Sequence, residues 1–198
     1  MTGCWQAVAA FCALVSVAYA LDPDDRLRWD APKIVASVFS ESLGMMGSER
    51  DDYATNLADY ATNLVISAKG DAASLALAHR AVALALQLSP KNKGATALNL
   101  QLSKGILPKP VEVGYHVTAL ARVLVSRGKL LVKQGGEENE QLARYFVQLG
   151  VEIDPTNYEL ARAAECLFPE KVAVDWERIA QGPSKKTMIT QPIDGSRN

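Results

Sequence analysis

Histidine, cysteine and aromatic residues are scarce in this 198-residue chain, which has 2 His, 3 Cys and 7% aromatic residues. Neither His79 nor His116 has a second metal ligand three or four positions away along a helix. A Gly-rich phosphate loop, a nucleophile elbow and a paired-acid motif are also missing. We therefore expect no catalytic residue, no metal and no cofactor, although missing motifs do not by themselves exclude catalysis.

A charge excess of either sign is missing as well. The chain has 21 Lys+Arg against 22 Asp+Glu, so its net charge is -1. Such a chain has no overall field to attract a phosphate backbone, which makes nucleic acid a poor candidate partner. The hydrophobic content of 48% is typical of one globular domain with a core of its own.

Charged residues are absent from the first 20 positions, MTGCWQAVAAFCALVSVAYA. An apolar run of this kind predicts a secretory signal peptide over 1–20, and Ala18-Tyr19-Ala20 supplies the small residues that signal peptidase requires. Cleavage would leave Leu21 as the new terminus of an exported, periplasmic or secreted protein. Because no Lys or Arg precedes the apolar run, the alternative is an uncleaved membrane anchor.

Signal cleavage would remove two of the three cysteines. Cys166 would then be the only thiol, so no disulfide could form within the chain. Leu160, Ala163 and Leu167 form an apolar helical face around it. We therefore expect Cys166 to pack in the core.

Glycine and proline divide the remaining sequence into short segments that are rich in strong helix formers. This pattern predicts an all-α fold. The expected helices are 31–43, 50–69, 71–89, 92–104, 114–133, 137–153, 156–167 and a short 170–181. Residues 21–49 would form a lead-in with its helix. Residues 169–198 would form the last short helix and, from Gly182 onward, a mobile C-terminal tail.

An internal repeat emerges when the chain is shifted by 65 positions. LAHRAVALALQLSPKN (77–92) then aligns with LARYFVQLGVEIDPTN (142–157), and Gly70 aligns with Gly135. These glycines predict tight left-handed turns after a helix. Ser89 and Asp154 are expected to cap the following helices, with proline next in the chain as the first helical residue.

The repeated pattern of small-residue turn, Ala-rich helix and D-P-x-N resembles the second half of a tetratricopeptide repeat. The resemblance covers residues 50–168 if the flanking helices are included. It implies antiparallel helix pairs stacked as a short array, with two units joined by the proline-containing linker 103–114. The Gly-to-Pro spacing is longer than the family's, and the family's Trp and Gly of the first helix are missing, so a plain helical bundle is the alternative.

A duplicated hexapeptide, DYATNL, occurs in the first helix of this region at residues 52–57 and 59–64. A spacing of seven residues is nearly two helical turns, so Asn56 and Asn63 would form a ladder on one side. The resemblance implies that the first helix of each pair faces a concave groove, where an Asn amide can donate to and accept from a peptide backbone. The alternative is that Tyr and Leu of this helix are core residues and the two Asn lie on a solvated flank.

Helix 114–133 is basic and contains no acidic residue. Arg122, Lys129 and Lys133 fall near one direction together with Thr118 and Ser126, while Val117, Leu120, Leu124 and Leu131 are expected to point the other way. This stripe is a candidate contact for an acidic peptide, a polyanionic glycan or phospholipid heads. The alternatives are pairing with Glu137, Glu138 and Glu140, or simple solvation.

These patterns predict an exported helical-repeat adaptor or scaffold that binds a protein or an extended peptide in the cell envelope. An acidic peptide is one candidate partner. Because the chain has no Asn-x-Ser/Thr site, a bacterial envelope is expected. The alternatives are a helical-bundle enzyme or small-ligand-binding protein with a site between helices, and a membrane-anchored subunit of an envelope complex. A membrane contact is expected only if residues 1–20 are retained.

Overall fold

The computed structural model describes residues 28–34, 36–41, 43–170 and 174–181. These residues contain helices and no strand, which confirms the all-α prediction. The helices are α1 Gly47–Ser67, α2 Ala72–Leu88, α3 Lys93–Ser103, α4 Val117–Gln134, α5 Glu137–Ile153, α6 Tyr158–Leu167 and α7 Trp176–Gln181. The expected signal peptide and the tail from Gly182 onward lie outside the described residues.

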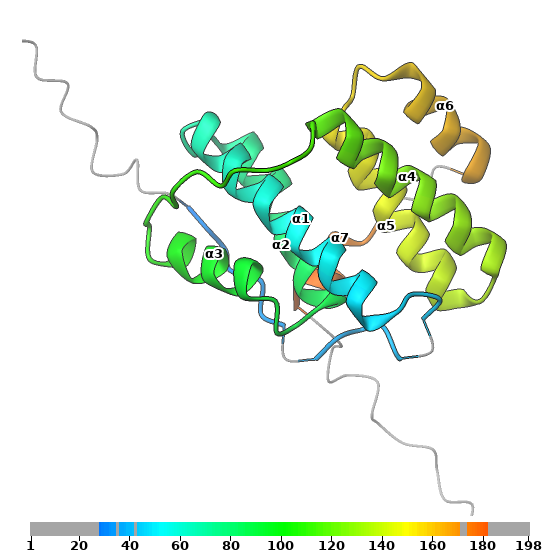
Figure 1. Ribbon diagram of the computed structural model, residues 1–198, viewed down its shortest axis with the longest axis horizontal. Coiled ribbons are helices and arrows are strands. Elements are labelled where there is room, and N and C mark those ends of the chain that lie inside the picture. The colour runs from blue at the N-terminus through cyan, green and yellow to red at the C-terminus, as the bar shows by residue number, and fades with distance from the viewer. Residues whose placement is uncertain (1–27, 35, 42, 171–173, 182–198) are drawn as a thin grey trace, which may run out of the picture.

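The helices form two antiparallel pairs, α1/α2 and α4/α5 (Figure 1). Helix α3 packs against α1 and α2, and α6 packs against α4 and α5. We call α1–α3 unit one and α4–α6 unit two. The two units meet where α2 packs against α5, and α7 returns from unit two to pack against α2.

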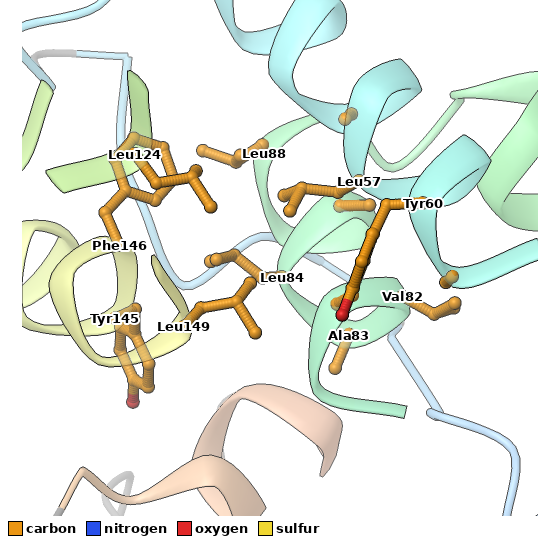
Figure 2. Close-up of a cluster of buried hydrophobic side chains, with 14 of the residues drawn as sticks. Leu57, Tyr60, Val82, Ala83, Leu84, Leu88, Leu124, Tyr145, Phe146 and Leu149 are labelled. Atoms are coloured by element: carbon orange, nitrogen blue, oxygen red, sulfur yellow. The ribbon is translucent and has the colours of Figure 1, made fainter. Parts of the chain in front are cut away.

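The core runs through both pairs and across the contact between them, as Figure 2 shows. Its large side chains come from α1, α2, α4 and α5, and include Leu57, Tyr60, Leu84, Leu88, Leu124, Tyr145, Phe146 and Leu149. Tyr53 of the duplicated hexapeptide stacks on Phe146, with 5.0 Å between ring centroids. The aromatic and leucine residues of the duplication therefore serve the core.

The turns within the two pairs are glycine turns, as predicted. Gly70 has a φ of 74° and Gly135 a φ of 73°, a left-handed conformation that glycine adopts without a Cβ clash. Asp71 caps α2 by accepting from the backbone N–H groups of Ala73 and Ser74, which satisfies donors that lack a partner inside the helix.

The predicted caps of α3 and α6 are wrong. Ser89 and Asp154 follow the ends of α2 and α5, and the helices begin three residues after each proline. The residues that cap them are Asn92 and Asn157, whose side-chain oxygens accept from the third N–H of their helices at 3.0 and 3.3 Å. An Asn side chain fits this position well, whereas Pro90 and Pro155 shape the preceding turns.

The predicted helix over residues 31–43 is also wrong. Backbone donors of this segment bond to distant partners instead of to the fourth residue before them. Lys33 N–H donates to the Ala180 carbonyl at 2.8 Å, and Val38 N–H donates to Gln87 Oε1 at 2.7 Å. The tertiary contacts therefore replace helical hydrogen bonds. Residues 28–34 and 36–41 form an irregular segment over unit one, which we call the strap.

Other helix boundaries differ by a few residues from those expected. Helix α1 spans Gly47–Ser67 instead of 50–69, α4 begins at Val117 instead of 114, and α6 begins at Tyr158 instead of 156. Helix α7 is confined to Trp176–Gln181, whereas the sequence pattern indicated 170–181.

Candidate partner-binding surfaces

Helix α4 has one side packed on α5 and one side in solvent. Its buried residues face the pair partner and include Leu120, Ala121, Leu124, Val125, Gly128 and Leu131. The predicted stripe residues Arg122, Lys129 and Lys133 are all exposed. None of the ion pairs among the described residues involves these three cations.

Apolar side chains accompany the cations on this exposed side. Val123 is 49% exposed and Leu130 is 50% exposed. Val123 directly follows Arg122, and seven residues later Leu130 directly follows Lys129. The apolar row and the basic row therefore run side by side along the exposed side of the helix. Val117, which was expected to point into the core, is exposed as well. We define Arg122, Val123, Lys129, Leu130 and Lys133 as the α4 surface.

The fourth cation of this helix has a structural role. Arg127 Nε lies 2.8 Å from Glu49 Oε1, and a terminal nitrogen of its guanidinium donates to the Gly44 carbonyl at 2.7 Å. Its side chain is only 10% exposed. Arg127 therefore ties α4 to the start of α1 and to the segment before it, and it is not available to a partner.

The acids at the start of α5 do not neutralise the α4 surface. A carboxylate oxygen of Glu138 accepts from the Ser40 hydroxyl at 2.7 Å. Glu140 accepts from Arg144 at 2.8 Å, within its own helix. Because no ion pair among the described residues joins Glu137, Glu138 or Glu140 to a cation of α4, the alternative of a stripe that closes on α5 does not describe this fold.

The side-chain amide of Asn63 forms two hydrogen bonds with a peptide backbone, and that backbone belongs to the linker 103–114 of the same chain. Its Nδ2 donates to the Val111 carbonyl at 2.9 Å, and its Oδ1 accepts from the Val111 N–H at 3.0 Å. Nearby, the Tyr115 hydroxyl donates to the Asn56 backbone carbonyl at 2.8 Å. The linker thus lies along the α1 side that the sequence assigned to a partner. An external peptide could reach Asn63 only if the linker moved.

The histidine in α2 lines a polar cavity of about 370 Å³ between the N-terminal strap, α2 and α7. Burial lowers the pKa of His79, while the charges of Asp30 and Glu177 oppose that shift. The cavity is lined without a serine, threonine or cysteine that could act as a nucleophile. Within the described residues, no cluster of three His, Cys, Asp or Glu side chains could hold a metal ion.

The prediction that Cys166 packs in the core is wrong, because the side chain is exposed. Helix α6 fully buries only Leu160, whereas Ala163 and Leu167 are half-buried. The sequence showed an apolar face on this helix but not whether another element covers it.

None of the described helices combines the length and the hydrophobicity that a membrane span needs. No family model, curated protein or solved structure matches the chain.

Proposed function

We propose that this protein is an exported, tetratricopeptide-like helical adaptor that binds a protein or peptide partner in the cell envelope through the α4 surface. One observation carries the proposal. Three exposed cations share a helix face with two exposed large apolar side chains, and these cations take part in none of the ion pairs described within the chain.

The chemistry of this face favours an acidic, amphipathic segment as the partner. Carboxylates would meet Arg122, Lys129 and Lys133, and apolar side chains would cover Val123 and Leu130. Apolar burial would supply affinity, while the charges would steer and orient the segment. Asn56 and Asn63 become additional contacts only in a state in which the linker has left α1.

The test is a triple substitution, Arg122→Gln, Lys129→Gln and Lys133→Gln, in the mature protein. Three exposed lysines of unit one, Lys91, Lys93 and Lys104, supply a matched control with the same charge change when replaced by Gln. Both variants should keep the melting temperature, because exposed charges contribute only about 0 to 1 kcal/mol each.

Partner capture from envelope extract should be lost in the α4 variant alone. It should also weaken with salt, because the Debye length shrinks from about 10 Å at 0.1 M to about 3 Å at 1 M. Equal capture by the wild type and both variants would refute the α4 surface as the binding site.

Export is tested separately by intact mass: a chain that begins at Leu21 supports cleavage, and a retained N-terminus supports the anchored subunit.

A second candidate function is small-ligand binding in the polar cavity beside His79. The presence of two carboxylates, a lysine and a half-buried imidazole around about 370 Å³ favours it. Loss of a ligand-induced rise in melting temperature on His79→Gln would support this function over the adaptor.

A further inference from the structure

Two places in the fold correspond to each other: the filled space between α2 and α3, which we call the first groove, and the groove between α5 and α6. Shifting Ala72–Leu88 by 65 residues gives Glu137–Ile153, the bounds of α5, and the same shift moves the start of α3 onto the start of α6. The capping residues Asn92 and Asn157 correspond under this shift. Residues that face the first groove can therefore be compared one by one with those of the second.

The groove of unit one is occupied by the chain itself. Trp29 Nε1 donates to Asn99 Oδ1 at 2.8 Å, and Asn99 Nδ2 donates to the Pro32 carbonyl at 3.3 Å. The Trp29 ring meets His79 edge to face, with 5.6 Å between centroids. An irregular, non-helical segment with one aromatic anchor thus fills the space between α2 and α3.

The corresponding groove of unit two is open among the described residues. It has a volume of about 350 Å³ and is lined by Val147, Val151, Ala161, Ala164 and Phe168, with Arg144 and glutamates at its rim. Arg144 is the counterpart of His79, and Ala164 is the counterpart of Asn99. The 65-residue shift therefore maps His79 and Asn99, the two residues that contact Trp29, onto residues that line this groove.

Burial along the second helices shows the same difference. Leu86 is buried, whereas its counterpart Val151 is half-buried. Ala83 is completely buried, whereas its counterpart Gln148 is exposed. Helix α5 thus leaves exposed a side whose counterpart on α2 is covered by the rest of the chain.

We propose that the α5/α6 groove binds an extended peptide segment of a partner protein, with an apolar anchor flanked by basic residues. The occupant of the first groove is non-helical, which argues for an extended segment in the second. Ala164 offers no hydrogen bond of the kind that Asn99 gives Trp29, so the anchor is a purely apolar side chain such as Phe.

Charge complementarity supplies the basic flank. Glu165 and Glu170 line the groove, and neither belongs to an ion pair described in the structure. Arg144 is already paired with Glu140 at 2.8 Å, and its guanidinium lies 4.4 Å from the Phe168 ring centroid. The rim is therefore acidic overall and favours Lys or Arg beside the anchor. This site lies apart from the α4 surface and takes a partner of opposite charge.

The test uses the mature chain and a labelled nonapeptide with the sequence of residues 28–36, in which Trp29→Phe supplies the apolar anchor. Fluorescence anisotropy should show saturable binding to the wild type. Ala164→Trp fills the groove and should weaken binding by about 10-fold or more, as expected for loss of an anchor pocket. Glu165→Lys with Glu170→Lys should weaken it by about 3- to 10-fold, and this loss should shrink at high salt.

Two control variants assign the effect to this groove. Asn99→Ala alters the groove of unit one, and Glu137→Lys with Glu159→Lys makes the same charge change at exposed positions outside the lining of the α5/α6 groove. Both should bind the peptide as the wild type does, and circular dichroism should show unchanged helicity in every variant. Full affinity in both groove variants would overturn the proposal, as would absence of saturable binding to the wild type. A loss confined to Asn99→Ala would also overturn it, because the peptide would then be replacing the chain's own strap.

Discussion

Unit one and unit two have second helices with corresponding bounds, but their surroundings differ. Every residue of α2 from Ala81 to Leu88 is buried, because α5, α7 and the strap cover the sides that α1 and α3 leave open. On α5, Gln148 is exposed and Val151 is half-buried. Unit one therefore uses the rest of the chain as its own covering, whereas unit two presents the α4 surface and the α5/α6 groove to solvent.

The comparison shows how one helical pattern can serve two purposes. Local sequence sets where each helix begins and ends, whereas the segments packed around it decide whether its faces stabilise the fold or stay accessible. The proposed binding sites both lie in unit two. Substitutions at corresponding positions of the two units should therefore have unequal effects.

The largest difference is expected between Gln87 and its counterpart Glu152. Gln87 is fully buried; its Oε1 accepts from Val38 N–H, and its Nε2 donates to the Ile179 carbonyl at 2.8 Å. Gln87→Leu leaves the partly buried Val38 N–H and the buried Ile179 carbonyl without these partners, and it should lower the free energy of unfolding by about 2 to 4 kcal/mol. Glu152→Gln, which changes a partly exposed ion pair, should cost about 1 kcal/mol or less. Equal losses in urea denaturation would contradict the comparison.

A smaller loss of stability is expected from a methyl group added to Gly150, where α5 packs closely on α4. A Cβ added to Gly150 would lie 2.9 Å from the Ala121 carbonyl oxygen and 2.8 Å from Val125 Cγ2. Gly150→Ala should therefore destabilise by about 1 to 3 kcal/mol despite the better helix propensity of alanine. The counterpart in unit one is already Ala85, so α1 and α2 accommodate the methyl group. A rise in melting temperature for Gly150→Ala would show that α4 can move away from α5.

The linker on α1 should be easier to release than the strap on α2. Asn63→Ala removes both hydrogen bonds to Val111 at an exposed position and should cost about 1 kcal/mol. Hydrogen exchange of the Val111 amide should become faster, because its acceptor is lost. Asn56→Ala is the control, since Tyr115 bonds to the backbone of Asn56 and not to its side chain. An unchanged Val111 exchange rate in Asn63→Ala would show that other contacts hold the linker.

The smallest effect concerns pH and the strap. Burial lowers the pKa of His79, so the unfolded chain binds this proton more readily than the folded chain does. The free energy of unfolding should therefore fall as the pH decreases below about 6.5, until the folded imidazole is protonated as well. His79→Gln should flatten this part of the profile, with His116→Gln as the control for removing an imidazole. A steeper profile in His79→Gln would contradict the assigned direction.

Several local features could be predicted because they depend on residues close in the chain. The left-handed turns at Gly70 and Gly135 were visible in the sequence. The caps Asn92 and Asn157 were missed, although their place three residues before the first buried helical residue was a usable signal. The competing interpretation gave weight to Pro90 and Pro155, which open helices in many proteins but shape turns here.

The site was less predictable, because exposure depends on what packs over each helix. The sequence placed Arg122, Lys129 and Lys133 on one face, and the structure leaves all three exposed. The sequence gave no sign that Arg127 forms an ion pair with Glu49, or that the Asn63 side chain bonds to the Val111 backbone. The seven-residue spacing of Val123 and Leu130 was the available signal for the apolar part of the α4 surface.

The sequence by itself determined the all-α class of the described residues, the approximate bounds of α1 to α6 and the 65-residue correspondence between the second helices of the two units. These properties follow from periodicity, caps and glycine turns, which act over about four residues. Only the tertiary structure decided that residues 31–34 and 36–41 belong to the strap instead of a helix, that the linker covers α1, and that Cys166 and the α5/α6 groove stay exposed. Each of these outcomes depends on contacts between residues far apart in the chain, and a segment adopts the conformation that satisfies its distant partners when those contacts outweigh its weak local helix propensity.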